Sequence, residues 1–211
     1  ACAGGGALVA GGVMSAPRTS WRRDEIRESW TAPDGHAACF VVGATLRVGN
    51  GTVPTAKAFE PDVLRAGVDA LGDGATALSK TLAWFAHAVD HYAGAHSIMR
   101  TDDDVARRVT DALPRAPLFG MVYHNVYWRP EHHRLRLYGR GEGDRGPFDV
   151  AYGPMLGLSR VAAVRLTRCA WAQSYARNLT HGRWSHGRED DGAIAYMLFE
   201  CMGYVRGALV Q

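Results

Sequence analysis

Three consecutive aspartates, Asp102, Asp103 and Asp104, have the residue types and spacing that most directly predict chemistry. They follow a segment over 96–100 that reads as a short strand, and α/β sheets bind ligands at the carboxyl ends of strands. Carboxylates this close repel one another unless a cation or a helix terminus offsets their charge. Asp102 and Asp104 therefore predict a Mn²⁺ or Mg²⁺ site that also holds a diphosphate. The alternative is that Asp104 caps a following helix and that its two neighbours are solvated.

Three basic residues indicate an anion. Arg23 and Arg27 lie four residues apart in a predicted helix over 21–30, and like charges at this spacing destabilise a helix. Lys80 lies near the start of a second predicted helix, where a cation opposes the helix dipole. A bound anion would relieve both strains. The alternative source of relief for the two arginines is the acidic residues at 24, 25 and 28.

Asp190 is the candidate general base. It lies in the sequence Glu189-Asp190-Asp191, immediately before an amphipathic segment that predicts a helix over 192–202. A helix amino terminus stabilises the ionised form of a carboxylate, which is the form that a base requires at neutral pH. A helix cap without catalytic function is the alternative reading of the same residues. No Ser or Cys lies in a recognisable nucleophile motif, and no glycine-rich loop matches a nucleotide fingerprint.

The elements that must position these residues alternate along the chain. Apolar runs typical of strands alternate with helical patterns, which predicts an α/β domain with a largely parallel sheet flanked by helices. The expected strands cover 7–15, 38–42, 63–68 and 96–100, with extended structure over 118–138. The expected helices cover 21–30, 78–92, 105–113 and 192–202, with a further helix after Ser159. Loops are expected at 50–57, 139–147 and 178–188.

Composition excludes several classes of protein. The chain has 211 residues, 47% of them hydrophobic and 21% charged, which describes a globular domain rather than a collagen-like, coiled-coil or disordered chain. The net charge of +3 is small and the arginines are scattered, so no nucleic-acid partner is expected. No stretch approaches the roughly 20 apolar residues of a membrane span. Four cysteines permit two disulfides in three connectivities, or four buried thiols, and sequons at Asn50 and Asn178 favour a secretory lumen.

Six short motifs, taken in order along nearly the whole chain, resemble the β-1,3-galactosyltransferases of glycosyltransferase family 31, which also contains β-1,3-N-acetylglucosaminyltransferases. Protist members are the most similar in the middle motif. Each motif is weak alone, and their order makes the resemblance specific. The motifs cover residues 22–30, Cys39-Phe40-Val41-Val42-Gly43, Leu78-Ser79-Lys80-Thr81-Leu82, Thr101-Asp102-Asp103-Asp104-Val105, 153–159 and Glu189-Asp190.

The resemblance implies a GT-A-like fold and an inverting transferase that moves galactose or N-acetylglucosamine from a UDP-sugar to a glycan hydroxyl in β-1,3 linkage. It implies Mn²⁺, or Mg²⁺, held by Asp102 and Asp104, with Asp103 among the donor-binding residues. Asp190 would be the base, and the basic residues Arg23, Arg27 and Lys80 would lie near the nucleotide. The implied setting is the Golgi lumen, with 1–211 forming a catalytic-domain fragment whose membrane anchor and stem precede Ala1 and whose last part follows Gln211.

Three departures from the family pattern bear on these expectations. Leu156 stands where the family usually has an aromatic residue, which is expected to alter acceptor or sugar contacts. Asp191 replaces a usual valine, so the choice of base between Asp190 and Asp191 stays open, and no histidine after Asp191 offers a further metal ligand. These departures motivate the alternative of a non-catalytic relative that binds glycan or nucleotide sugar or assists another transferase. An unrelated metal-dependent phosphoryl-group enzyme is a third hypothesis.

Overall fold

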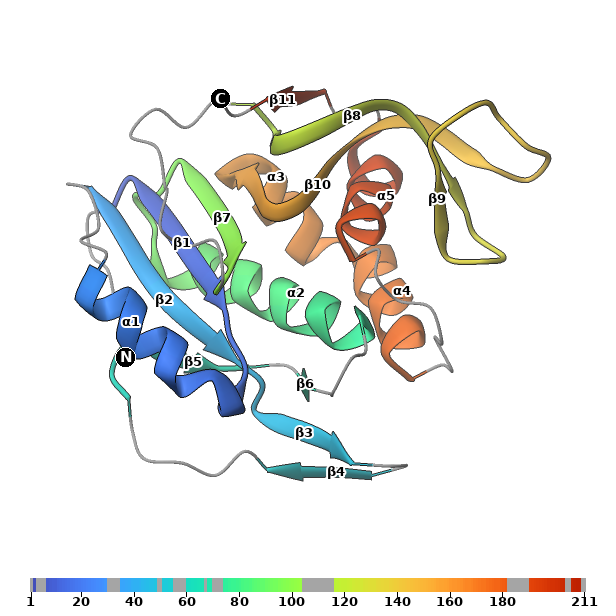
Figure 1. The fold of residues 1–211 in the computed structure, drawn as a ribbon. Helices are drawn as coiled ribbons and strands as arrows, with labels where there is room; N and C mark the ends of the chain where they lie inside the picture. Colours follow the sequence, from blue (N-terminus) through green and yellow to red (C-terminus); the bar gives the residue numbers. More distant parts are fainter. Residues whose placement is uncertain are drawn as a thin grey trace.

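The protein is an α/β structure with helices on both faces of a central sheet (Figure 1). The coordinates are a computed structural model. It describes residues 2, 7–29, 35–48, 51–54, 60–66, 68–69, 74–103, 116–181, 190–203 and 206–209. In this part of the chain no helix is both long and apolar enough to cross a membrane.

Eight strands form the central sheet, in the order β11-β8-β10-β7-β1-β2-β5, with β9 paired to the outer part of β8. Their bounds are β1 (Val9–Met14), β2 (His36–Val42), β5 (Val63–Arg65), β7 (Ser97–Asp102), β8 (Leu118–Arg129), β9 (Arg134–Arg136), β10 (Arg145–Ser159) and β11 (Gly207–Leu209). A second, three-stranded sheet contains β3 (Thr45–Val48), β4 (Gly51–Pro54) and β6 (Val68–Asp69).

The central sheet is mixed, so the prediction of a mostly parallel sheet is wrong. β7, β1, β2 and β5 are parallel neighbours, whereas β10 runs antiparallel to both β7 and β8. No helix separates β8 from β10 in the chain, and a short connection without a crossover can join only antiparallel strands. The two strands extend past the helices as a long hairpin that carries β9 (Figure 1).

The helices divide between the two faces of the sheet. A 3-10 turn, η1 (Pro17–Thr19), leads into α1 (Ser20–Ser29), whose Ile26 is buried with Val13, Phe40 and Val42 on one face. The other face is covered by α2 (Gly74–His91), α3 (Arg160–Arg168), α4 (Ala170–His181) and α5 (Asp190–Met202), which pack against one another over the main core. The apolar positions of α2 recur at helical spacing, and Trp84 at its centre is fully buried.

Several local expectations need correction. The loop expected at 50–57 contains β4, which pairs with β3 as a hairpin. The single strand expected over 63–68 is two strands in different sheets, because β5 pairs with β2 and β6 pairs with β3. Asn178, expected in a loop, is an exposed residue near the end of α4. The helix predicted over 105–113 and the sequon at Asn50 lie outside the described residues.

All four cysteines are paired. Cys2 is joined to Cys39 at the centre of β2, and Cys169, between α3 and α4, is joined to Cys201 in the last turn of α5. This is one of the three connectivities open to the sequence. Disulfides form and persist in oxidising environments.

Candidate functional site

A hollow of about 320 Å³ lies where β1 and β7 end. This is the edge of the sheet at which α/β proteins bind ligands. Four basic and two acidic side chains line it, so its charge suits an anion accompanied by a cation. The lining residues are Met14, Ser15, Ala16, Arg18, Thr19, Arg22, Ala77, Lys80, Arg100, Asp102 and Asp103.

Arg100 connects the aspartate cluster to the start of α5. Its Nη1 donates to Asp102 Oδ1 at 2.9 Å, and its Nη2 lies 3.3 Å from Asp190 Oδ2 and donates to Asp191 Oδ1. The Arg100 side chain is only 5% exposed. Asp102 and the Asp190-Asp191 pair, which lie far apart in the sequence, thus share one buried guanidinium. The candidate metal ligand and the candidate base meet around it.

Three carboxylates around one guanidinium leave an excess of buried negative charge. Burial, with a further contribution from the Asp190 carboxylate, raises the pKa of Asp191 to about 7, although Arg100 opposes the shift. Burial acts to lower the pKa of Arg100, but Asp190, Asp191 and Asp102 outweigh it and raise that pKa above its usual range. The cluster therefore has the electrostatics to hold an extra proton or a cation.

The two aspartates at the start of α5 differ in their partners. Asp191 accepts from Arg100 through Oδ1 and from the Gly153 backbone N–H through Oδ2, at 2.9 Å, so both of its oxygens are engaged. Asp190 Oδ2 accepts no hydrogen bond within the described part of the chain, although it lies close to Arg100. Asp190 therefore keeps a buried oxygen without a hydrogen-bond donor from the described residues, whereas Asp191 anchors Arg100 to β10.

Asp102 and Asp103 face different surroundings. The Asp102 side chain is 44% exposed at the rim of the hollow. Asp103 is engaged at both oxygens: Oδ1 accepts from Arg22 at 2.9 Å, and Oδ2 accepts from the Ser15 and Thr19 hydroxyls at 3.0 and 2.9 Å. Asp103 thus shapes the wall of the hollow. Asp104 lies outside the described residues.

Asp102 is the described residue that fits a divalent cation. Its carboxylate supplies the hard oxygen ligands that Mn²⁺ and Mg²⁺ accept, and it opens onto the hollow rather than into the core. Nowhere in the described ranges do three or more His, Cys, Asp or Glu side chains gather as a complete ligand set.

Lys80 and Arg22 line the hollow and come from different helices. Lys80 extends from α2, is buried, and donates from Nζ to the Ser15 carbonyl at 3.0 Å. Arg22 extends from α1 toward Asp103. Lys80 was expected from the sequence, whereas Arg22, the immediate neighbour of an expected residue, was not.

Arg23 and Arg27 do not line the hollow. Arg23 is buried and donates to the Ala16 carbonyl at 2.9 Å, to Ser15 and to Glu60. It therefore holds residues that line the hollow without lining the hollow itself. Arg27 forms ion pairs with Asp24, Glu60 and Asp62 on the outer side of α1.

Glu60 and Asp62 therefore provide most of the negative charge that compensates Arg23 and Arg27. The sequence alone allowed a bound anion or nearby acidic residues in this role. The Asp62 hydrogen bond, against the effect of burial, raises the pKa of Arg27 above its usual range. The Arg27 hydrogen bond lowers the pKa of Asp62.

Leu156 cannot alter ligand contacts in the way expected from the sequence. It pairs with Arg100 and Gly120 in the middle of the sheet and is fully buried in the main core. The nearby irregularity is a bulge in β10 between Tyr152 and Leu156, which brings the Gly153 N–H to Asp191. The motif over 153–159 thus contributes backbone and core positions, and its Ser159 caps α3.

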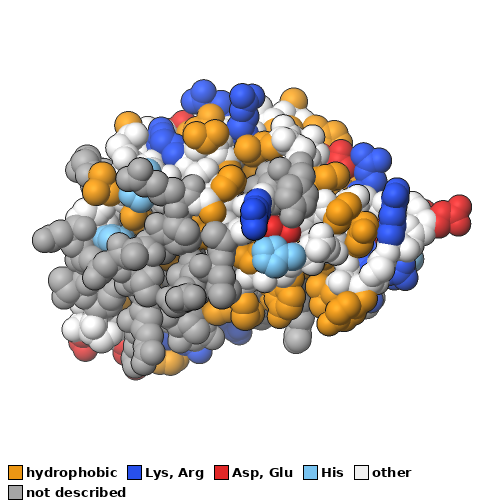
Figure 2. All heavy atoms as spheres, turned by 90° about the horizontal axis from the view of Figure 1, so that it is seen from above, with side chains coloured by type: hydrophobic (Ala, Val, Ile, Leu, Met, Phe, Trp, Pro, Cys, Tyr) orange, Lys and Arg blue, Asp and Glu red, His pale blue; other side chains and the backbone are white. Residues whose placement is uncertain are grey.

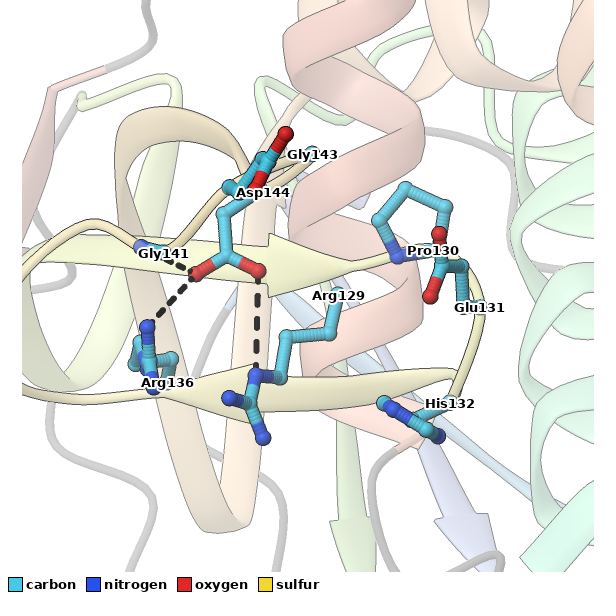
Figure 3. Close-up of a pocket in the computed structure, with 9 residues that line it drawn as sticks. Arg129, Pro130, Glu131, His132, Arg136, Gly141, Gly143 and Asp144 are labelled. Atoms are coloured by element: carbon cyan, nitrogen blue, oxygen red, sulfur yellow. Dashed lines mark hydrogen bonds and ion pairs between the residues drawn. The ribbon is translucent and has the colours of Figure 1, made fainter.

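A second polar hollow, of about 300 Å³, lies on the hairpin around Arg129 and Arg136 (Figure 3). Asp144 points between the two arginines and accepts from the Gly141 N–H at 2.7 Å and from Arg136 at 3.3 Å. These contacts fasten the segment over 139–144 that was expected to be a flexible loop. None of the predicted site residues lines this hollow.

Sequence reasoning missed Arg100, although a signal was present. Arg100 follows Ser97, Ile98 and Met99 in a strand whose burial is nearly complete, and a charge in such a strand requires a partner. The partner could not be identified, because it lies on α5, far along the chain. Basic groups elsewhere are dispersed, and on the face in Figure 2 they lie in separate places among hydrophobic and uncharged side chains.

No protein-family model matches the chain, and no curated protein matches it significantly.

Proposed function

We propose that the chain is an inverting, metal-dependent glycosyltransferase of the β-1,3-galactosyltransferase type. In this proposal it transfers galactose or N-acetylglucosamine from a UDP-sugar to a hydroxyl of a glycan acceptor in β-1,3 linkage. The observation that carries the proposal is the Arg100 guanidinium shared by Asp102, at the end of β7, and Asp190, at the start of α5. The order of the six sequence motifs supports it, and a GT-A-like variant of the fold is part of the proposal.

The hollow supplies the groups that a nucleotide diphosphate requires. Lys80, Arg22 and Arg18 bring positive charge to it from three segments of the chain. Asp102, together with Asp104, would hold the Mn²⁺ or Mg²⁺ ion. When bound, such an ion neutralises the charge that develops on the departing diphosphate.

Asp190 would take the proton of the acceptor hydroxyl. Its Oδ2 is buried and has no hydrogen-bond donor among the described residues, so in this proposal the acceptor hydroxyl would reach it and supply that donor. Asp191 and Gly153 would hold Arg100 in place beside it. A base on one side of the sugar and a departing diphosphate on the other lead to inversion in a single displacement.

The first test is metal-dependent UDP binding, measured by calorimetry with the whole chain. We expect UDP to bind with Mn²⁺, Asp102→Asn to weaken binding at least about tenfold, and Asp190→Asn to leave it within about twofold. Asp24→Asn, which removes an exposed carboxylate on α1, is the matched control. Absence of Mn²⁺-dependent UDP binding would contradict the proposal.

The second test is turnover. UDP-Gal, UDP-GlcNAc and UDP-GalNAc are assayed for hydrolysis and transfer, and Asp190→Asn should lower kcat by about 10²-fold or more, as expected for loss of a general base. Retained turnover in Asp190→Asn together with its loss in Asp191→Asn would reassign the base to Asp191.

A non-catalytic relative is the second candidate. Two departures from the family pattern motivate it, Leu156 and the lack of a histidine after Asp191 in the sequence. Under this hypothesis UDP-sugar or glycan binds without Mn²⁺ and no donor is hydrolysed, so the calorimetry and the donor screen distinguish the two functions.

The implied location, the Golgi lumen with a membrane anchor outside this chain, belongs to the same proposal. The two disulfides support an oxidising compartment.

A further inference from the structure

An uncharged hollow of about 220 Å³ lies on the sheet next to the start of α5. It is lined by Tyr123 of β8, Val150 and Tyr152 of β10, Leu135 of β9, and Leu137. None of these residues has a role in the site described above. An uncharged lining does not suit a diphosphate, which the basic hollow beside β7 already matches.

Strand register explains why this part of the sheet is open. Tyr152 lies opposite Met121 and Val150 opposite Tyr123, so the four side chains share one face of the antiparallel pair. Phe148, two residues before Val150, lies on the same face and packs against Tyr196 and Phe199 of α5. Because α5 begins at Asp190, its helix covers the Phe148 end of this face, and Tyr123 remains 41% exposed.

Two contacts connect residues that line or adjoin the hollow to the start of α5, where the candidate base lies. Tyr152 is followed by Gly153, whose N–H donates to Asp191. On the other side, Leu135 packs so closely on Gly192 that a Cβ there would lie 2.6 Å from Leu135 Cγ. The hollow is therefore bounded by residues adjoining the Asp190-Asp191-Gly192 turn, the point at which an acceptor hydroxyl must arrive if Asp190 is the base.

The aromatic geometry indicates the class of ligand. The rings of Tyr123 and Tyr152 are 6.0 Å apart between centroids and tilted at 84°, an edge-to-face pair that forms a corner with aliphatic side chains around it. An aromatic face is electron-rich and attracts the polarised C–H groups on the apolar side of a pyranose ring. The hydroxyls of such a sugar point away from that side.

We propose that this tyrosine hollow, lined by Tyr123, Leu135, Leu137, Val150 and Tyr152, binds a β-linked hexopyranose of the acceptor by its apolar face. The proposal rests on the proposed function, because it places the acceptor beside Asp190. Met121, 48% exposed, continues the same face outward, so the next sugar of an oligosaccharide acceptor would lie over it.

The test uses the whole chain and two probes, methyl β-D-galactopyranoside and methyl β-D-N-acetylglucosaminide. Saturation-transfer NMR reports which sugar protons contact the protein, and titration gives Kd. We expect the strongest transfer to the axial C–H protons of one ring face for at least one probe. Tyr123→Ala and Tyr152→Leu should each weaken its binding about tenfold, which corresponds to about 1.4 kcal/mol.

Two controls separate stacking from general effects. Tyr123→Phe keeps the ring and should retain binding within about twofold. Tyr138→Ala removes a tyrosine that is 88% exposed and does not line the hollow, and it should also leave binding unchanged. Far-ultraviolet circular dichroism and urea unfolding of every variant check that each one is folded, and Mn²⁺-dependent UDP binding is measured separately.

The outcomes distinguish this inference from the proposed function. If UDP binds but neither sugar does, or if Tyr138→Ala weakens sugar binding as much as Tyr123→Ala, the tyrosine hollow is not the acceptor site while the transferase proposal stands. If both sugars bind at the hollow but UDP does not bind, the transferase proposal fails and the hollow remains a glycan site. Failure of both probes and of UDP overturns both.

Discussion

At the scale of single residues, the candidate site is arranged around the Arg100 side chain, which contacts three carboxylates. A buried guanidinium is stable only with carboxylates around it, and the three that surround Arg100 are also the groups with the chemistry to act on a substrate. Removing Arg100 would leave Asp102, Asp190 and Asp191 facing one another without a counter-charge. In the proposed function Arg100 is therefore a positioning residue. The excess negative charge that it leaves uncompensated is expected to make the stability of the protein depend on pH.

Asp191→Asn is expected to remove that pH dependence. The folded chain holds a proton on Asp191 up to a pKa of about 7, against an ordinary value of 3.8, so between these values it binds more protons than the unfolded chain. The contribution of Asp191 to the free energy of unfolding is therefore greatest below about pH 4 and is lost as pH rises through 7, by at most about 4 kcal/mol.

Urea unfolding of the two proteins between pH 4 and 8, without added metal, measures this difference. The wild-type chain should lose stability over this range relative to Asp191→Asn. Asp90→Asn, at an exposed position of α2, is the control and should follow the wild type. Parallel pH profiles for wild type and Asp191→Asn would show that Asp191 is ionised throughout.

At the scale of secondary-structure elements, the bulged strand β10 connects the core to the site. It pairs with β7 and β8, carries the N–H that holds Asp191, and lies beneath α5. The bulge needs space on the neighbouring strand. Gly120 of β8 provides it, with φ at +147° and with the Met155 carbonyl so close that a Cβ would lie 2.6 Å from its oxygen.

Gly120→Ala should therefore destabilise the protein by about 2–4 kcal/mol, because backbone strain adds to a clash that neither strand can relieve without shifting the bulge. Gly139→Ala is the matched control, since that glycine also has a positive φ but no atom within 4 Å of the added methyl. Its cost should be about 1 kcal/mol. Urea unfolding measures both, and equal costs would mean that the bulge relaxes around the new methyl group.

At the scale of the whole molecule, the two disulfides join segments that are far apart in the sequence. The Cys169–Cys201 bond ties the end of α5, the helix that begins with Asp190, to the junction of α3 and α4. The Cys2–Cys39 bond ties the start of the described chain to β2. Both bonds act on the main core, where α2, α3, α4 and α5 pack together.

Replacing Cys169 and Cys201 together with alanine should lower the free energy of unfolding by about 3–4 kcal/mol, since the bond closes a loop across a sequence separation of 32 residues. Urea unfolding of the double variant, compared with the wild type in the absence of reductant, measures the loss. Adding reductant to the wild type should reproduce at least this loss. Unchanged stability in the double variant would mean that the two cysteines are not bonded in solution.

The sequence by itself determined the local features. The period of the apolar residues predicted α2 and α5, and the strand pattern predicted β1, β2 and β7. These predictions are confirmed because helix and strand periodicity are properties of neighbouring residues. That a ligand approaches at Asp102, the end of β7, stays a prediction.

Only the tertiary structure decided which distant residues meet. It made the sheet mixed by inserting β10 between β7 and β8, directed Arg23 and Arg27 toward Glu60 and Asp62, and placed Leu156 in the core. It also joined Asp102 to Asp190 through Arg100, a residue that no motif singled out. The physical reason is that a buried charge needs a partner, and chain topology, rather than spacing along the chain, brings that partner within hydrogen-bond reach.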